Sequence, residues 1–324
     1  VGVPVQCAEF VPHQLARHVP WSTDFVAQEI RVMRTHLPSG EVVQTPSAGY
    51  MLERALFDRA LATAACQCGV DLLLGTRAVA PSERGLVAQS EKERFEIETL
   101  IIIGADGPRS TVGRWIGQVN RELIHASQCQ VVLEREVEGV EIYFDPFYAG
   151  GYGWLFPKGP TANVGVGWRF GHRPSEALQH LLDRLRIRRT AILGHTDGFI
   201  PSGGPLEKTW EGNFILVGDA AGQTHPITGA GIAHACLCGE MAGRVAAEAA
   251  RNGELGYLAE YESEWRSFLG GVLAHALRKR HFLEEHWSED GEALSKVLRQ
   301  SWVAFPAYGH RGGAAAAGEG SWLS

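Results

Sequence analysis

The chain has 324 residues, of which 45% are hydrophobic and 21% are charged. A chain of this length accommodates about two domains, and its composition excludes the intrinsically disordered and fibrous classes. The formal net charge of -7 argues against a nucleic-acid partner, because a surface that binds phosphates has to be basic.

Apolar runs in the sequence are no longer than a strand, well short of the ~18 to 20 residues that cross a bilayer. We therefore expect no transmembrane segment and a cytoplasmic location. The cysteines include two C-x-C pairs and no C-x-x-C, and we interpret them all as buried thiols of a reducing compartment, with no metal site. They are Cys7, Cys66, Cys68, Cys129, Cys236 and Cys238.

The first hundred residues alternate between strand and helix patterns. Residues 30–43, interrupted by a Pro-Ser-Gly turn, predict two strands. Apolar residues that recur every three to five positions predict a helix over 50–68, which Gly69 ends. The apolar run 70–74 then predicts a short buried strand.

Further strands are predicted over 78–90 and 94–103, and the apolar run 100–103 is typical of a strand covered on both faces. The middle of the chain differs, because glycine-separated aromatic strands over 141–170 predict an inserted sheet. A leucine-rich helix is expected after Ser175.

The strand-and-helix pattern resumes with a fully apolar strand over 213–217 and an alanine-rich helix over 229–250. Beyond Arg251 the pattern is helical, and the Gly/Ala-rich tail after Gly312 predicts disorder. The whole chain therefore predicts an α/β fold with an inserted sheet.

The most specific motif follows the strand over 213–217. A carboxylate at the carboxyl edge of a sheet accepts hydrogen bonds from sugar-like hydroxyls, and glycines at a helix start let backbone amides approach a flat anionic ring. The alternative is a plain strand-turn-helix corner whose glycines serve tight packing. The candidate binding residues are Gly218, Asp219, Pro226, Gly229, Ala230, Gly231 and Ile232.

A second motif, with Asp106 and Gly107, again ends a strand in a carboxylate. Alone, an Asp-Gly turn before a helix has a purely conformational explanation. Together the two motifs resemble those of flavoproteins of the hydroxylase type. The resemblance implies bound FAD, with Asp219 at its ribityl chain and Asp106 and Gly107 close to the cofactor. Gly113 stands where this group usually has an Arg near a pyridine nucleotide.

Aromatic residues and glycines at a spacing of two form a third motif, which resembles that of the geranylgeranyl reductase branch. Alternation along a strand places the aromatic residues on one face, and the glycines share one face of the next strand. We expect the bare glycine backbone to form a slot for an apolar chain, and the alternative is an aromatic core face. The candidate substrate-binding residues are Tyr152, Trp154, Phe156, Pro157, Gly165 and Gly167.

Two smaller features agree with the resemblance. Arg54 stands where these flavoproteins place an Arg near the FAD phosphates, although a surface salt bridge explains it nearly as well. Residues 4–9 resemble the Cys-Gly-Glu turn of the reductase branch, with Ala8 in place of Gly. The resemblance makes Cys7 a weak catalytic candidate, as a redox or proton-donating group.

The glycine-rich pyrophosphate turn G-x-G-x-x-G, which the resemblance implies near the beginning, does not follow any predicted strand. We therefore expect that the chain lacks an opening βαβ unit of roughly 40 residues. The implied organisation is a Rossmann-like FAD-binding domain in two parts, 1–117 and 206–250, with an inserted, mainly antiparallel substrate-binding domain over 118–205 and C-terminal helices over 251–324.

These features predict an FAD-dependent reductase of carbon-carbon double bonds in an isoprenoid lipid, with NADPH, NADH or ferredoxin as the electron donor. The alternatives are an FAD-dependent monooxygenase or halogenase, and a non-catalytic prenyl-binding protein on the same fold. A lipid substrate implies peripheral contact with the inner face of a membrane. The aromatic stripe from Tyr261 to Leu273, followed by Arg278, Lys279 and Arg280, is a candidate contact, although core packing explains it equally well.

Overall fold

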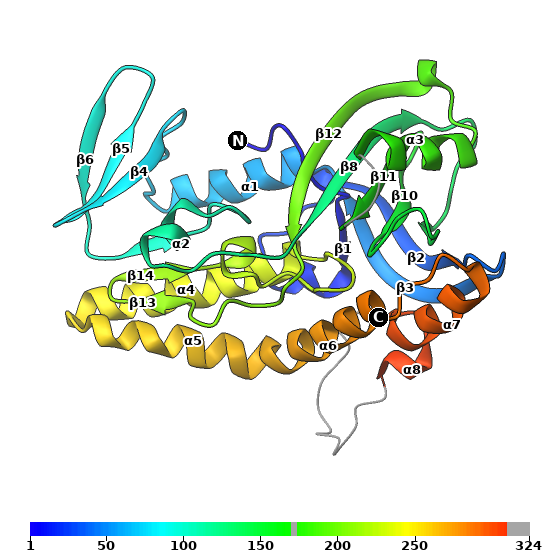
Figure 1. The fold of residues 1–324 in the computed structure, drawn as a ribbon. Helices are drawn as coiled ribbons and strands as arrows, with labels where there is room; N and C mark the ends of the chain where they lie inside the picture. The colour runs from blue at the N-terminus through cyan, green and yellow to red at the C-terminus, as the bar shows by residue number, and fades with distance from the viewer. Residues whose placement is uncertain (170–173, 310–324) are drawn as a thin grey trace. The chain divides into compact units, whose positions relative to one another are not determined.

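The computed structural model describes residues 1–169 and 174–309, so the tail after Gly312 lies outside the described residues (Figure 1). The chain forms two compact units. The first, called the sheet unit below, contains Val1–Ala64, Ile124–Ile200 and the chain from Arg278. The second, called the motif unit, contains Ala65–Leu123 and Pro201–Leu277.

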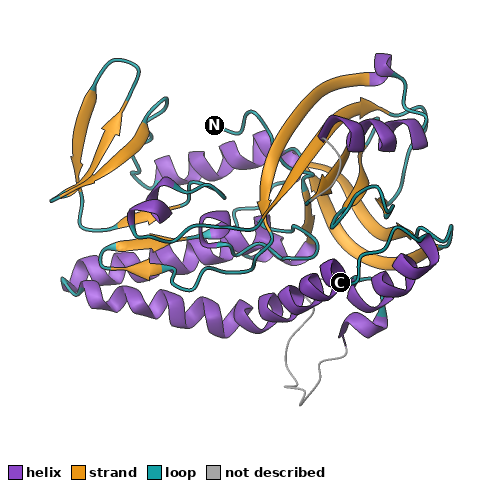
Figure 2. Ribbon diagram, viewed as in Figure 1, coloured by secondary structure: helices purple, strands orange, loops and turns teal. Residues whose placement is uncertain are grey.

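Helices and sheets occur in both units, so the predicted α/β class is confirmed (Figure 2). The sheet unit is built on an eight-stranded sheet in the order β1-β3-β2-β9-β10-β11-β8-β12. β10 pairs antiparallel with β9 and β11, whereas β2 and β9 run parallel. The strands are β1 (Phe10–Pro12), β2 (Val26–His36), β3 (Val42–Leu52), β8 (Leu123–Val132), β9 (Val140–Tyr143), β10 (Tyr152–Lys158), β11 (Thr161–Trp168) and β12 (Ile192–Pro201).

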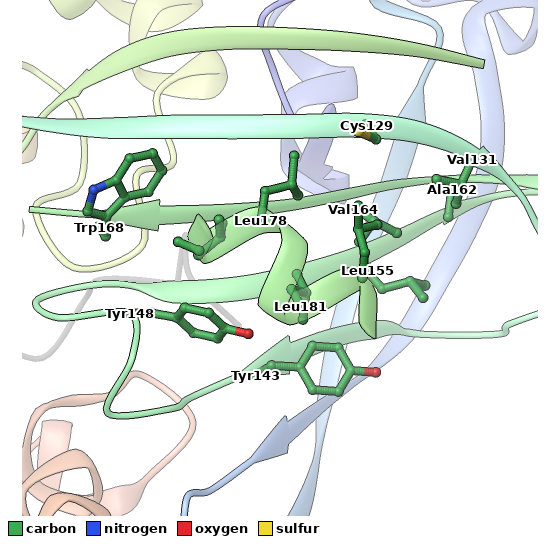
Figure 3. Packing of buried hydrophobic residues seen from close by; sticks show 13 residues of the cluster. Cys129, Val131, Tyr143, Tyr148, Leu155, Ala162, Val164, Trp168, Leu178 and Leu181 are labelled. Atoms are coloured by element: carbon green, nitrogen blue, oxygen red, sulfur yellow. The ribbon is translucent and has the colours of Figure 1, made fainter. Parts of the chain in front are cut away.

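One face of this sheet is buried by helix α3 (Pro174–Arg184), which confirms the helix predicted after Ser175. Leu178 and Leu181 of α3 pack in one cluster with Leu155 of β10 and Val164 of β11 (Figure 3). A spacing of three to four residues brings these leucines to one side of the helix. The packing holds β10 and β11, the two strands of the aromatic motif.

The opposite face of β10 carries Trp154, whose partner in the antiparallel register is Gly165. A Cβ atom at Gly165 would lie 2.3 Å from Cζ2 of the Trp154 indole, and one at Gly167 would lie 3.1 Å from Cγ2 of Ile124. The expectation that these glycines leave bare backbone for a ligand is therefore wrong. Side chains of the same sheet, the indole above all, already cover their surface.

The motif unit contains two three-stranded sheets. In the first, the order is β13-β14-β7, and β14 runs parallel to β7. The second has the order β4-β5-β6. The strand predicted over 213–217 is confirmed as β14, and the segments 78–90 and 94–103 each contain two strands. The bounds are β4 (Arg77–Ser82), β5 (Gly85–Gln89), β6 (Arg94–Glu98), β7 (Ile102–Gly104), β13 (Trp210–Glu211) and β14 (Phe214–Leu216).

Helices α4 and α5 lie side by side in the motif unit (Figure 1). The stripe residues Tyr261, Trp265, Leu269 and Leu273 are at most 2% exposed and pack with Ile215 of β14. These four residues are therefore core residues and not a membrane contact, whereas Phe268 of the same segment is 37% exposed. The helices of the described chain include α1 (Arg54–Gln67), α2 (Thr111–Trp115), α4 (Ile232–Asn252), α5 (Ala259–Trp265), α6 (Gly271–Glu285), α7 (Gly291–Ser301) and α8 (Pro306–Gly309).

Two apolar runs are more exposed than their sequences predict. The run 70–74 forms no strand, and four of its residues are 49 to 67% exposed, because none of the described strands pairs with it. In the run 100–103, Leu100 is 63% and Ile103 is 39% exposed. In β7 Ile102 is buried on one face and Ile103 is exposed on the other, so this strand is not covered on both faces.

Three other local predictions need correction. Helix α1 begins at Arg54, not at residue 50, because residues 50–52 complete β3. Of the six cysteines that the sequence predicts to be buried, only two are. Cys66 and Cys68 are exposed, Cys7 and Cys236 are half-buried, and Cys129 and Cys238 are buried. Arg280 of the predicted basic segment is 1% exposed and pairs with a carboxylate of its own helix. In the described part of the chain, no helix is both long and apolar enough to span a bilayer.

The contact between Trp154 and Gly165 gives a testable prediction. Replacing Gly165 by Ala should lower the free energy of unfolding by about 1 to 3 kcal/mol, because the new methyl group overlaps the indole and both lie in a packed face. The control is Gly194→Ala, since Gly194 also lies in a strand of this sheet and a Cβ there meets no atom within 4 Å. Urea unfolding that shows equal stability for the two variants would contradict this packing.

Candidate functional site

The two predicted carboxylates follow neighbouring strands of one sheet. The parallel register pairs Leu216 of β14 with Gly104 of β7, and the Val217 amide donates to the Gly104 carbonyl oxygen at 3.0 Å. Asp106 comes two residues after Gly104, and Asp219 comes two residues after Val217. Because parallel strands end at the same edge of a sheet, both residues lie at the carboxyl edge of this one.

The turn that carries Asp219 is held by buried polar side chains. The Gly218 amide donates to Oε1 of Gln223 at 2.8 Å, and Nε2 of Gln223 donates to the Tyr261 hydroxyl at 3.0 Å. That hydroxyl donates to the Leu216 carbonyl oxygen at 2.9 Å. Gln223 and Tyr261 are fully buried and were not singled out by the sequence as parts of the site. They fix where the strand ends and where the turn begins.

The carboxylate of Asp219 lies beside the start of helix α4. Its Oδ1 accepts a hydrogen bond of 2.6 Å from the Thr224 hydroxyl. A Cβ atom at Gly231 would lie 3.0 Å from the same oxygen, so the glycine allows the helix start to approach the carboxylate. Gly229, with φ of 68°, makes the turn just before it. The structure therefore brings the predicted residues 218–219 and 226–232 together.

These residues fit the pyrimidine side of a flavin. Gly231 is the N-cap of α4 and has no side chain, and the amides of the first helical turn have no partner within the helix. The positive end of a 21-residue helix favours negative charge at this point. Gly229, Gly231 and Ile232 are half-buried and Ala230 is exposed, whereas Pro226 is buried and shapes the turn.

Asp106 has a different local role. Its Oδ1 accepts from the Ser110 hydroxyl at 2.5 Å, and its Oδ2 accepts from the amides of Thr111 and Val112 at 2.6 and 3.2 Å. Asp106 therefore caps the start of α2, which is the conformational alternative that an Asp-Gly turn suggests. Gly107 supplies the turn with φ of 81°.

Gly113 departs from the family pattern for a local reason. A Cβ atom there would lie 2.5 Å from the carbonyl oxygen of Gln118, so any larger residue requires the backbone to shift. The neighbouring Arg114 donates to the carbonyl oxygen of Arg109 and to the Thr111 hydroxyl, both at 2.8 Å. Its guanidinium is engaged within its own turn.

Two buried histidines flank the start of α4. His234 donates from Nδ1 to the Gln223 carbonyl oxygen at 2.8 Å, and Nδ1 of His225 accepts from the Thr228 amide at 3.2 Å. Burial lowers the pKa of both, and that of His225 falls to about 3 with a further contribution from His234 and His275. Both rings are neutral at physiological pH. His225 stands beside the motif in the sequence, but its spacing gives no sign of this burial.

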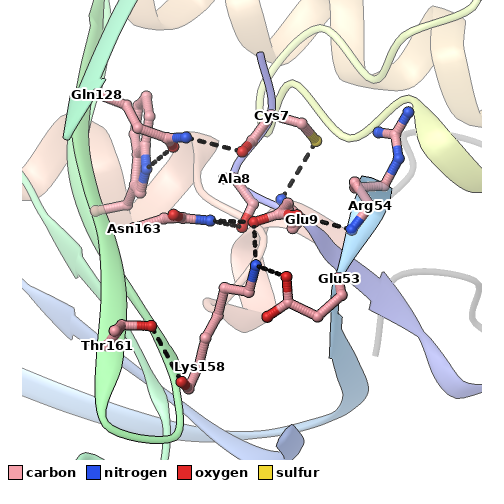
Figure 4. Close-up of polar contacts among 10 residues, drawn as sticks. Cys7, Ala8, Glu9, Glu53, Arg54, Gln128, Lys158, Thr161 and Asn163 are labelled. Carbon is pink, nitrogen blue, oxygen red and sulfur yellow. Dashed lines mark hydrogen bonds and ion pairs between the residues drawn. The ribbon is translucent and has the colours of Figure 1, made fainter. Parts of the chain in front are cut away.

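In the sheet unit, the turn over residues 7–9 is held by side chains of three strands (Figure 4). Gln128 donates to the Cys7 carbonyl oxygen at 2.9 Å, and Asn163 donates to Oε2 of Glu9 at 2.7 Å. Lys158 forms an ion pair with the same carboxylate, also at 2.7 Å. Glu9 is 4% exposed and has φ of 73°, which few residues other than glycine adopt. The sequence analysis missed this cluster.

The thiol of Cys7 and the guanidinium of Arg54 lie close to this turn (Figure 4). The Glu9 amide donates to Sγ of Cys7 at 3.2 Å. Burial raises the pKa of the thiol, and the charge of Arg54 opposes this only in part. Cys7 therefore carries its proton at neutral pH. Arg54 donates two hydrogen bonds to Asp58, at 2.8 and 3.1 Å, which is the salt-bridge alternative for this residue.

The aromatic residues of β10 share one face of the sheet. The ring centroids of Tyr152 and Trp154 are 6.0 Å apart, and Phe156 packs edge-on against Phe10 at 6.1 Å. The Trp154 indole donates from Nε1 to Oε1 of Gln128 at 3.2 Å. Burial raises the pKa of Tyr152, so its hydroxyl stays neutral. Pro157, next to this row, is buried.

The comparisons with known proteins agree with this geometry. Residues 18–272 match the tryptophan halogenase family. The digeranylgeranylglycerophospholipid reductase of Methanothrix thermoacetophila is 35% identical over 326 residues, which cover 92% of this chain and 82% of that protein. Digeranylgeranylglycerophospholipid reductase 2 of Methanopyrus kandleri is 32% identical over 323 residues, with coverage of 92% and 82%.

Solved structures show the same fold. A geranylgeranyl bacteriochlorophyll reductase-like protein from Thermoplasma acidophilum is 25% identical and superimposes with a TM-score of 0.79, covering 93% of this chain and 88% of that one. A triple mutant of the flavin-dependent brominase Bmp2 is 16% identical and superimposes with a TM-score of 0.71, covering 94% and 88%. At that identity the brominase shows a shared fold only.

The burial of His225 predicts how stability depends on pH. Between pH 6.5 and about 3 the unfolded chain binds a proton at this residue and the folded chain does not, so stability falls as the pH is lowered. From pH 7 to 5 the loss due to His225 should be about 2 kcal/mol. In His225→Asn, whose Oδ1 can accept the Thr228 amide, that part of the loss should disappear from urea unfolding curves.

The control for this measurement is His281→Asn, because His281 is exposed. This variant should lose as much stability as the wild type over the same pH range. A His225→Asn protein that loses as much as both would contradict the proposed neutral state of the buried ring.

Proposed function

This chain belongs to the geranylgeranyl reductase family of flavin-dependent oxidoreductases, and from that premise we propose that it is an FAD-dependent reductase of carbon-carbon double bonds in an isoprenoid lipid. The observation that carries the proposal is the meeting of the Asp219 carboxylate with the glycine-flanked start of α4. Relatives named for the reduction of a digeranylgeranyl lipid support the substrate class.

We infer that the motif unit holds the flavin through the residues that the sequence singles out. Asp219 would accept hydrogen bonds from ribityl hydroxyls. The amides of Gly229 and Ala230 already donate to His225 and Thr228, so the helix start at Gly231 and Ile232 would hold the pyrimidine ring. Bound reduced FAD supplies a hydride. The amides and the helix dipole at Gly231 stabilise negative charge on the ring. Asp106 contributes by shaping its loop, since both of its oxygens cap α2.

We infer that the segment 118–205 binds the substrate, with Tyr152, Trp154 and Phe156 as its apolar surface. The indole of Trp154 lies on Gly165, so an isoprenoid chain would contact the aromatic row and not the glycine backbone. The backbone of Cys7 is held by the hydrogen bond from Gln128 of β8, and the Cys7 thiol keeps its proton at Sγ. To bind FAD phosphates, Arg54 would have to exchange its pair with Asp58.

The proposal includes an external electron donor, which is NADPH, NADH or ferredoxin. It also places this protein in the cytoplasm, where it reaches its lipid substrate at the inner face of a membrane. Arg114, next to the position where the family carries an Arg, is engaged within its turn, which makes a nicotinamide site at this loop less favourable. The buried residues Tyr261, Trp265, Leu269 and Leu273 cannot supply the membrane contact.

The role of Asp219 is tested by flavin content. Asp219→Ala removes the carboxylate beside the helix start, so purified full-length protein should carry at least tenfold less flavin by visible absorbance, an order-of-magnitude loss expected for a charged hydrogen-bond acceptor. The control is Asp197→Ala, since Asp197 is half exposed and lies in β12. Unchanged flavin content in Asp219→Ala would show that the site is assigned wrongly.

The reaction itself is tested by products. With reduced cofactor and a polyprenyl lipid, mass spectrometry should show a gain of two hydrogens per double bond without oxygen consumption. Oxygen-dependent hydroxylation or halogenation would identify the monooxygenase or halogenase alternative, which the tryptophan halogenase match keeps in view. If the purified protein shows no flavin absorbance that dithionite can bleach, it is a non-catalytic binding protein.

A further inference from the structure

Asn120 joins the two loops of the motif unit that follow β7 and β14. Its Nδ2 donates to the carbonyl oxygen of Pro108 at 3.1 Å and to that of Asp219 at 2.8 Å. These acceptors are 12 and 99 residues away in the sequence. An amide nitrogen carries two N–H donors, so one side chain can hold two carbonyl groups at once.

The same side chain packs against the turn after Asp219. A Cβ atom at Gly222 would lie 2.9 Å from Oδ1 of Asn120 and 2.5 Å from the carbonyl oxygen of Gly204. Gly222 has φ of 68°, and its amide donates to the Asp219 carbonyl oxygen at 3.1 Å. The Asp219 carbonyl therefore receives a backbone and a side-chain donor, and the turn has little space in which to shift.

The strands by themselves position these loops only at their bases. The parallel ladder of β14 and β7 pairs three residues on each strand, and the hydrogen bond from Val217 to Gly104 extends it by one step. Asp219 comes two residues after Val217. The bridge through Asn120 lies beyond the ladder, between the loops that carry the two motif carboxylates, Asp106 and Asp219.

We propose that Asn120 is a positioning residue for the flavin site, which sets the distance between the loop of Asp106 to Pro108 and the turn of Asp219. The inference rests on the proposed function, because it assigns FAD to these loops. A ligand group held by fixed donors and acceptors loses affinity when its supporting contacts are displaced by fractions of an ångström. Asn120 acts through the backbone of Asp219 and does not itself have to contact FAD.

The test is Asn120→Asp in the full-length protein. Asp has the shape of Asn, but its carboxylate faces two carbonyl oxygens and donates to neither. The dissociation constant for FAD, measured by fluorescence quenching, should rise about tenfold. In the protein without FAD, amide hydrogen exchange should become faster both in residues 106–109 and in residues 218–222.

The matched control is Asn213→Asp. Nδ2 of Asn213 donates to the Leu100 carbonyl oxygen at 3.1 Å, so it also bridges the β7 and β14 segments, but at the amino end of the strands. This variant loses one hydrogen bond to a carbonyl oxygen where Asn120→Asp loses two, and urea unfolding measures the loss of stability in both variants. Its dissociation constant for FAD should stay within about twofold of the wild type.

The outcomes separate the inference from the proposed function. A higher dissociation constant in Asn120→Asp alone supports the inference. If the dissociation constant for FAD of Asn120→Asp equals that of the wild type, or rises equally in both variants, the inference is overturned and the proposed function stands. A wild-type protein that binds no FAD overturns both.

Discussion

The parallel pairing of β14 with β7 is the interaction on which the candidate flavin site depends. It consists of only three residue pairs, yet it sets the carboxyl ends of both strands at one edge. A short ladder at a sheet edge has little stability of its own. The residues around it supply the rest: Ile215 lies in the core with α4 and α5, and Leu216 packs on Ile102 from the other side. Burial of these strands therefore determines where Asp106 and Asp219 can be.

The sheet unit contains a buried ion pair whose charges need partners. Glu9 and Lys158 are almost fully buried, and an unpaired charge in such a place would be strongly destabilising. Each oxygen of Glu9 has donors, since Oε1 accepts the Arg54 amide and Oε2 accepts Lys158 and Asn163. In a buried pair of this kind the desolvation penalty offsets much of the Coulomb attraction, so the pairing avoids a large cost more than it adds stability. It ties the turn at Cys7 to the strands of the aromatic motif.

The sequence predicts local features well where the pattern and the partner come from the same segment. The β2–β3 hairpin, helix α3 and both carboxylate motifs are of this kind. It fails where burial depends on a distant partner. The apolar run 70–74 indicates that its side chains favour burial, but it does not indicate which strand would pair with it. For the same reason the stripe from Tyr261 to Leu273 is compatible with a membrane or a core, and only the position of Ile215 decides.

Long-range contacts also explain why the sequence predicts the motif residues but not the residues that hold them in place. Tyr261 hydrogen-bonds to Leu216 and Gln223, 45 and 38 residues away, and Gln128 bonds to the backbone 121 residues before it. Each of these pairs is separated by far more residues than a local motif spans, so no local motif contains both partners. The glycines of the third motif are found from their spacing. The side chain that covers Gly165, which is the Trp154 indole, follows only from the register of β10 and β11. A local motif therefore identifies short segments of backbone, whereas the contacts that hold those segments in place come from residues outside the motif.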